Sequence, residues 1–230
     1  MNLLDIYEFK NRYPHELSGG QSQRVALARS LAPGTSLVLL DEPFCSLDVE
    51  VRSRLRSELS SVLKSCSASA ILVTHDPHEA LAICDRVAVL RSGEIQQYST
   101  PFEMVLNPSN HFIGQFVLQK NILPIRYIND FYSTCIGKLN FPKDTDISTK
   151  SVCMFDKNAI RIEPCLNGFF TVISKEYRIN HYVYTVISES LKLKSEMSLD
   201  TSLSIGEKCK VEPIHDKNFL VLPENIKCKF

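Results

Sequence analysis

The chain has 230 residues, of which 44% are hydrophobic and 23% are charged. This composition supplies enough apolar material for folded cores and excludes collagen-like, low-complexity and disordered classes. Basic and acidic residues balance at 26 each. No overall positive field would therefore hold a polyanion, which disfavours a dedicated nucleic-acid binder. The length indicates two modest domains.

The composition changes along the chain. Residues 1–118 are net acidic and richer in arginine than in lysine, whereas residues 119–230 are net basic and rich in lysine. We therefore place a domain boundary near Leu118. No apolar stretch is long enough for a membrane span, and the first residues lack a signal-peptide pattern, so we expect a cytoplasmic protein. The eight scattered cysteines lack metal-ligand spacing and are interpreted as reduced thiols.

The first half alternates short apolar runs with helical periods, a pattern typical of strands and helices around a mainly parallel sheet. Runs at 37–40, 70–74 and 87–90 predict strands. The first of them is expected to be buried, and the third turns at 92–93 into a hairpin. An amphipathic helix is predicted over 51–66, and a shorter helix follows the second strand. In such sheets, ligands bind beyond the carboxyl ends of the strands.

Three titratable residues stand at these strand ends. Asp41 and Glu42 follow the first run and His75 follows the second. Adjacent carboxylates are costly unless a cation binds them, so Asp41 suits a magnesium ion held with nucleotide phosphates, and Glu42 suits a general base toward water. The alternative is a solvated strand end. His75 could contact a terminal phosphate and the attacking water, or be an ordinary strand-end residue.

A second group of polar residues precedes a predicted helix. Ser18 and Gln21 fit a capping box, in which two side chains satisfy free amides of the first helical turn. Gly19 and Gly20 are harder to explain by capping, because glycine weakens a helix. They suit a backbone that must come close to an anion such as a phosphate. Asp48 could simply cap the helix after it.

The order and spacing of four segments resemble ATP-binding cassette (ABC) transporters. These segments are the signature motif Leu17–Arg29, the Walker B strand Leu37–Pro43, the D-loop Ser46–Asp48 and the switch-histidine loop Thr74–Asp76. The resemblance implies an α/β fold for residues 1–118, namely part of the parallel sheet of a P-loop NTPase.

The resemblance also implies a role for each candidate residue in a head-to-tail pair of ATPase subunits that bind ATP and Mg²⁺. The signature motif of one subunit would act on ATP bound to the other. The roles are catalytic for Glu42 and His75, magnesium binding for Asp41, and nucleotide binding for Ser18, Gly19, Gly20, Gln21 and Asp48.

The second half is expected to be a small all-β barrel. Alternating runs predict strands at 152–155, 159–162, 182–186, 209–212 and 219–223. This half resembles the OB-like TOBE domain of bacterial importer ATPases for sugars, polyamines, sulfate and ferric iron. An OB-like barrel is also compatible with nucleic-acid or oligosaccharide binding, which the many lysines of this half would favour. Because aromatic and basic residues do not interleave densely on any strand, we expect no nucleic acid and favour a regulatory or dimer-supporting domain.

The sequence contains no G-x-x-x-x-G-K-[ST] phosphate loop. By the resemblance this loop would precede Met1, so we expect the chain alone to bind ATP weakly or not at all. The first hypothesis is an ATP-binding subunit, or a fragment of one, that couples ATP hydrolysis to solute import, with ferric iron preferred. It would bind permease subunits at the inner face of the cell membrane. The alternative is an inactive truncated paralogue that pairs with a complete ATPase.

Overall fold

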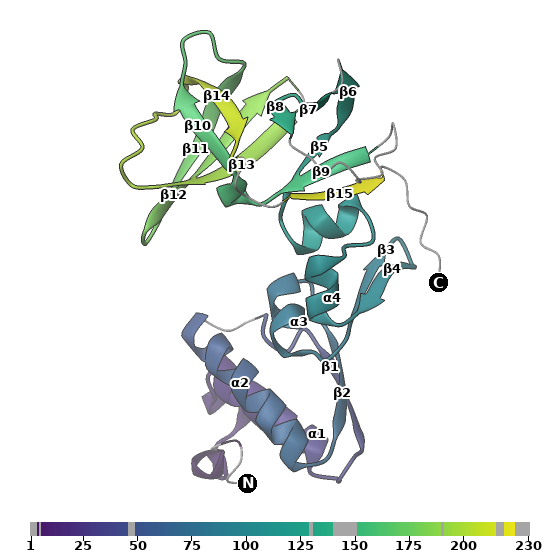
Figure 1. Ribbon diagram of the computed structural model, residues 1–230. Helices are drawn as coiled ribbons and strands as arrows, with labels where there is room; N and C mark the ends of the chain where they lie inside the picture. Colours follow the sequence, from purple (N-terminus) through teal and green to yellow (C-terminus); the bar gives the residue numbers. More distant parts are fainter. Residues whose placement is uncertain are drawn as a thin grey trace. The chain divides into compact units, whose positions relative to one another are not determined.

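A computed structural model describes residue 4 and residues 6–45, 49–128, 131–139, 151–189, 191–214 and 219–223 (Figure 1). The chain forms two compact units. The N-terminal unit comprises Met1–Val87 with Ser99–Pro101, and the C-terminal unit comprises Ala88–Tyr98 with Phe102–Phe230. The boundary near Leu118 stays a prediction.

The N-terminal unit combines a parallel strand pair with helices, as expected for the α/β class. Strands β1 and β2 pair in parallel, with Leu37 opposite Ser69 and Asp41 opposite Val73. All elements predicted for this unit are present. They are α1 (Gly19–Leu31), β1 (Leu37–Asp41), α2 (Val49–Ser65), β2 (Ser69–Val73) and α3 (Pro77–Ile83), preceded by short 3₁₀ helices at Tyr7–Phe9 and Pro14–Glu16.

A small core holds the N-terminal unit together. Phe44, Leu55 and Leu59 are buried in one cluster, and partly buried leucines from α1 and β1 pack against it. Leu55 and Leu59 lie one helical turn apart on α2, so the same face of the helix supplies both. The amphipathic pattern of 51–66 is thereby confirmed.

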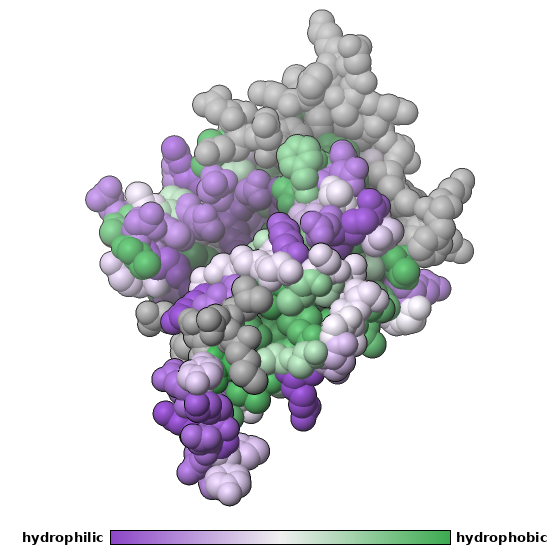
Figure 2. Space-filling model, turned by 90° about the horizontal axis from the view of Figure 1, so that it is seen from below, coloured by the Kyte–Doolittle hydropathy of each residue, from purple (hydrophilic) through white to green (hydrophobic). Residues whose placement is uncertain are grey.

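One face of the β1–β2 sheet is exposed although it is apolar. Leu37, Leu39, Ile71 and Val73 are 51%, 71%, 54% and 55% exposed, whereas Val38 on the opposite face is buried. The prediction that the first strand is buried is therefore wrong for this face. Successive strand residues point to opposite sides, and none of the described helices of the unit covers the second side. Seen from below, the surface of the molecule has a hydrophobic area with hydrophilic side chains around part of it (Figure 2), and the exposed apolar residues of β1 and β2 are those named above.

The predicted hairpin is confirmed as strands β3 (Val87–Arg91) and β4 (Glu94–Ser99). Ser92 and Gly93 have φ angles of 51° and 81°. Two positive φ angles in a two-residue loop are the signature of a type I′ turn, whose twist matches that of paired strands. Helix α4 (Pro101–Leu106) and a π-helical turn, Ile113–Val117, follow.

Apart from a 3₁₀ turn at Lys157–Ala159, the described remainder of the C-terminal unit consists of strands and their connections, and each predicted run there forms a strand. A five-stranded sheet has the order β10-β14-β11-β12-β13, and two three-stranded sheets have the orders β15-β9-β5 and β6-β7-β8. The strands are β5 (Asn121–Pro124), β6 (Arg126–Ile128), β7 (Phe131–Thr134), β8 (Gly137–Leu139), β9 (Ser151–Phe155), β10 (Ile160–Pro164), β11 (Phe170–Arg178), β12 (His181–Ser188), β13 (Leu191–Met197), β14 (Lys208–Pro213) and β15 (Phe219–Pro223).

The five-stranded sheet curls into a barrel-like form. Its two edge strands, β10 and β13, contact each other, and the Ser195 hydroxyl donates a hydrogen bond of 2.8 Å to the Ile160 carbonyl. The Asn121 side chain ties β5 to this sheet through two hydrogen bonds with the backbone of Lys194, at 2.7 and 2.8 Å. The all-β expectation is confirmed, and the OB type stays a prediction. Within the described residues, no helix has the length and apolar character needed to cross a bilayer.

Candidate functional site

The site is built from the ends of β1 and β2. Asp41 is the last residue of β1 and lies opposite Val73. The next residue, Glu42, has a φ of 47°, which is uncommon for a residue with a side chain. Its amide donates a hydrogen bond of 2.9 Å to the Val73 carbonyl, which holds this conformation in place. Non-glycine residues with such backbone strain concentrate at functional sites.

Glu42 and His75 are in direct contact. The Glu42 Oε1 atom accepts a hydrogen bond of 3.0 Å from the His75 amide and lies 2.7 Å from the His75 Nδ1 atom. One carboxylate oxygen thus engages both the backbone and the ring of the same residue. The His75 side chain is 78% exposed and that of Glu42 is 34% exposed, so both can reach a bound molecule. The two catalytic candidates are therefore brought together.

The pKa of His75 is raised above its ordinary value of 6.5, first by the hydrogen bond to Glu42 and then by the negative charge of Glu42. Asp76 and Glu79 add smaller effects of the same sign. Protonated His75 is therefore favoured in the folded protein. The contact of protonated His75 with Glu42 therefore adds to the free energy of unfolding. This contribution is fully present below about pH 6.5 and is lost as the pH rises through the raised pKa of His75.

We expect the substitution Glu42→Gln to lower the pKa of His75 toward its ordinary value, because glutamine carries no charge. The measurement is an NMR titration of the His75 ring in the 230-residue chain. Glu8→Gln, which changes an exposed glutamate elsewhere in the N-terminal unit, is the matched control and should leave the titration unchanged. An unaltered His75 pKa in Glu42→Gln would contradict the assigned contact.

The loop that carries His75 is itself fixed by hydrogen bonds. The Thr74 hydroxyl donates to Glu79 Oε2 at 2.6 Å and accepts from the Asp76 amide at 3.1 Å. Asp76 caps α3 by accepting from the His78 amide at 2.9 Å. Glu79 was not singled out from the sequence. Its position three residues after the cap is the available signal, since glutamate there often bonds the cap residue.

Ser18 and Gln21 form the predicted capping box at the start of α1. The Gln21 amide donates to the Ser18 hydroxyl at 3.4 Å, and the Ser18 amide donates to Gln21 Oε1 at 3.1 Å. Gly19 and Gly20 are the first two residues of α1 and do not have positive φ angles. Their backbone conformation therefore does not require glycine. Their amides belong to the first turn of the helix and therefore have no hydrogen-bond acceptor within it.

The structure does not bring this capping group together with the carboxylate site. Ser18, Gly19, Gly20 and Gln21 make no hydrogen bond to Asp41, Glu42 or His75 among the described residues. Within the described residues, the helix start and the strand ends therefore share no hydrogen bond. Asp48, the remaining nucleotide-binding candidate, lies outside the described residues.

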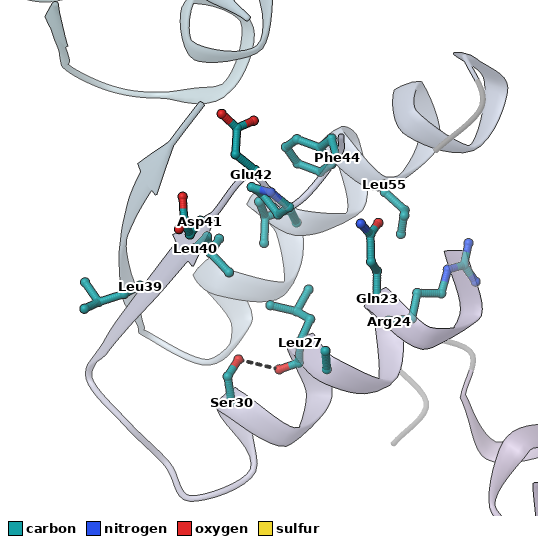
Figure 3. Close-up of a pocket in the computed structure, with 13 residues that line it drawn as sticks. Gln23, Arg24, Leu27, Ser30, Leu39, Leu40, Asp41, Glu42, Phe44 and Leu55 are labelled. Carbon is teal, nitrogen blue, oxygen red and sulfur yellow. Dashed lines mark hydrogen bonds between the residues drawn. The ribbon is translucent and has the colours of Figure 1, made fainter. Parts of the chain in front are cut away.

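A cavity of about 280 Å³ is lined by residues of α1, β1 and α2, and Asp41 and Glu42 are among its lining residues, with their carboxylate groups pointing away from α1 (Figure 3). Its wall is largely apolar. Gln23 is an exception, because its buried Oε1 atom has no hydrogen-bond partner in the described part of the chain. The lining residues are Gln23, Arg24, Ala26, Leu27, Ser30, Leu39, Leu40, Asp41, Glu42, Pro43, Phe44, Leu55 and Leu59.

Comparison with known proteins relates the N-terminal part of the chain to ABC transporters. Residues 1–45 match the model of the ABC transporter family. The matched stretch contains the capping group of α1 and both carboxylates at the end of β1, but not His75. The matches to individual proteins extend the similarity to ATP-binding subunits of importers.

The Fe(3+) ions import ATP-binding protein FbpC of Haemophilus influenzae is 42% identical over 135 residues, which cover 59% of this chain and 38% of FbpC. The sulfate/thiosulfate import ATP-binding protein CysA 2 of Chromobacterium violaceum is 48% identical and covers 54% of this chain and 34% of its own length. The solved structure of cbiO1 from Clostridium perfringens, part of the ABC transporter complex cbiONQ, is 30% identical. Its match covers 47% of this chain and 43% of cbiO1, with a TM-score of 0.44.

The chain spans a little over a third of the length of these curated relatives.

Proposed function

We propose that the N-terminal unit contributes to ATP hydrolysis by an ABC importer, as an ATP-binding subunit or as part of one. The observation that carries the proposal is the contact of 2.7 Å between Glu42 Oε1 and His75 Nδ1 at adjacent strand ends. A carboxylate held this way can accept a proton from a water molecule, and a protonated histidine can stabilise negative charge on a phosphate.

The start of α1 is proposed to bind the phosphates of ATP. The free amides of Gly19 and Gly20 and the positive end of the helix favour an anion, and Ser18 supplies a hydroxyl beside them. By the resemblance of Leu17–Arg29 to the signature motif, this surface would act on ATP held by a second ATPase subunit. The similarity of residues 1–45 to the family model supports this assignment.

Asp41 is proposed to bind Mg²⁺ together with the phosphates of ATP. The protein groups at this position fit magnesium only when phosphate oxygens and water supply most of its ligands. Asp41 is one exposed carboxylate, and no cluster of three or more histidine, cysteine, aspartate or glutamate side chains that could hold a metal occurs among the described residues. Magnesium commonly takes one or two protein carboxylates and completes its shell with phosphate and water. When bound, it would neutralise phosphate charge.

The remaining assignments follow from the importer relatives. We propose a second ATPase subunit and membrane permease subunits as partners, with the chain peripheral to the inner face of the membrane. Asp48 would lie at the interface between the ATPase subunits. The relatives are named for different solutes, Fe(3+) in one case and sulfate or thiosulfate in the other. Similarity therefore gives little support to ferric iron over the other solutes.

A chimera tests the proposed function. It joins the part of FbpC that precedes its match to the 230 residues of this chain, and its Mg²⁺-dependent ATP hydrolysis is compared with that of the chain alone. We expect hydrolysis by the chimera and little or none by the chain alone, because the chain's sequence has no phosphate loop. A folded chimera that fails to hydrolyse ATP would overturn the proposal.

A further inference from the structure

Glu79 is a buried carboxylate whose role the proposed chemistry does not explain. It lies on α3 and is only 4% exposed. Among the ion pairs of the described residues, none includes Glu79. Its carboxylate accepts a hydrogen bond of 2.6 Å from the Thr74 hydroxyl. Burying a carboxylate costs free energy of folding unless hydrogen bonds compensate. A glutamate at this position therefore calls for an explanation.

Helix capping does not require this carboxylate. Asp76 already caps α3 through its bond from the His78 amide, and the Glu79 amide bonds to the Asp76 carbonyl at 3.1 Å. In an ordinary capping box the glutamate would accept from the amide of the cap residue. Here the Asp76 amide donates to the Thr74 hydroxyl oxygen instead, and Glu79 accepts a hydrogen bond from that hydroxyl.

The resulting chain of hydrogen bonds encloses His75. It runs from the Asp76 amide to the Thr74 hydroxyl and on to Glu79, so the residues before and after His75 are tied to one anchor on α3. A hydroxyl has one proton, and here that proton is directed to Glu79 while the oxygen accepts from the amide. The turn is thereby fixed in one conformation.

We propose that Thr74 and Glu79 are positioning residues that hold the His75 amide and ring on the same Glu42 oxygen. Both contacts with Glu42 Oε1, at 3.0 and 2.7 Å, depend on the backbone direction at His75, which the Thr74–Glu79 bond sets. The consequence for ATP hydrolysis rests on the proposed function. The positioning itself does not, because it concerns only contacts inside the N-terminal unit.

The test compares Thr74→Val with Thr74→Ser in the 230-residue chain. Valine has nearly the shape of threonine but no hydroxyl, whereas serine keeps it. The readouts are the NMR titration of the His75 ring and the chemical shift of the His75 amide. The acidic groups that act on His75 are Glu42, Glu79 and Asp76. Each of them is retained in both variants, so a change reports altered geometry rather than lost charge.

We expect Thr74→Val to shift the His75 amide and to lower the pKa of His75 part of the way toward the value in Glu42→Gln. Thr74→Ser should keep both readouts at their wild-type positions. Glu79→Ala removes the acceptor of the Thr74 hydroxyl and should shift the His75 amide resonance in the same direction as Thr74→Val. It replaces Thr74→Val in the test if the valine variant does not fold. Wild-type His75 readouts in a folded Thr74→Val or Glu79→Ala chain would overturn the proposal.

These outcomes are separable from the proposed function. If the chimera with FbpC does not hydrolyse ATP but Thr74→Val changes the His75 titration, the positioning role stands without the ATPase. If the chimera is active and the titration is unchanged, the ATPase stands and the positioning role fails.

Discussion

Replacing Gly168 with alanine is expected to destabilise the C-terminal unit by about 3 kcal/mol, at the upper end of overpacking effects. A Cβ atom at this position would lie 2.2 Å from the Cys209 carbonyl oxygen and 2.4 Å from its carbonyl carbon. These are backbone atoms of β14, which pairs with both β10 and β11, so they cannot move aside as a flexible side chain would. The backbone must therefore shift either in β14 or in the loop that carries Gly168.

Urea unfolding followed by near-ultraviolet circular dichroism measures this effect. Tyr184 is fully buried in the core of the C-terminal unit and provides the signal. Leu166→Ala is the control, because Leu166 is in the same loop and is 96% exposed; its effect should stay within about 0.5 kcal/mol. Equal unfolding midpoints for Gly168→Ala and the control would show that the close approach to Cys209 is not maintained in solution.

The second large effect is expected in the chimera with FbpC. Glu42→Gln should lower kcat for ATP hydrolysis by roughly 100-fold to 10,000-fold, the usual contribution of a general base. Glutamine has the same shape and its oxygen can still accept from the His75 amide, so folding should be preserved. KM for ATP should change little, because a residue that acts only on the attacking water contributes mainly to the transition state.

Steady-state kinetics on the purified chimera checks this result. Glu8→Gln makes the same chemical change at an exposed position of the N-terminal unit and should leave kcat and KM unaltered. A Glu42→Gln chimera that keeps the wild-type kcat would remove Glu42 from the catalytic role, although ATP binding by the assembly would remain in place.

Local patterns in the sequence located part of the secondary structure. Hydrophobic periodicity depends on neighbours two to four residues away, so it located α2, β1, β2, the β3–β4 hairpin and five later strands (β9, β10, β12, β14 and β15). The strands β5 to β8, β11 and β13 were not predicted. The capping box at Ser18 and Gln21 is a local arrangement of the same kind and is confirmed at the atomic level. The order of motifs related the chain to ABC transporters, which the match of residues 1–45 supports.

Burial could not be predicted in the same way. The run at 37–40 is apolar enough for a strand buried on both faces, yet Leu39 is 71% exposed. Burial depends on which elements pack against each face, and among the described residues only one face of β1 is covered. The close approach of Gly168 to Cys209 could not be predicted from local sequence patterns either, because the two residues are 41 positions apart in the sequence.

The sequence by itself determined which residues could carry chemistry, because Asp41, Glu42 and His75 stand at strand ends regardless of how the strands are packed. Only the tertiary structure decided that one Glu42 oxygen meets both the amide and the ring of His75, and that Glu79 anchors the turn between them. Glu42 and His75 are 33 positions apart in the sequence, and the parallel pairing of β1 and β2 brings them together. A contact of that kind depends on strand register and on a positive φ at Glu42, and neither quantity is a property of the local sequence.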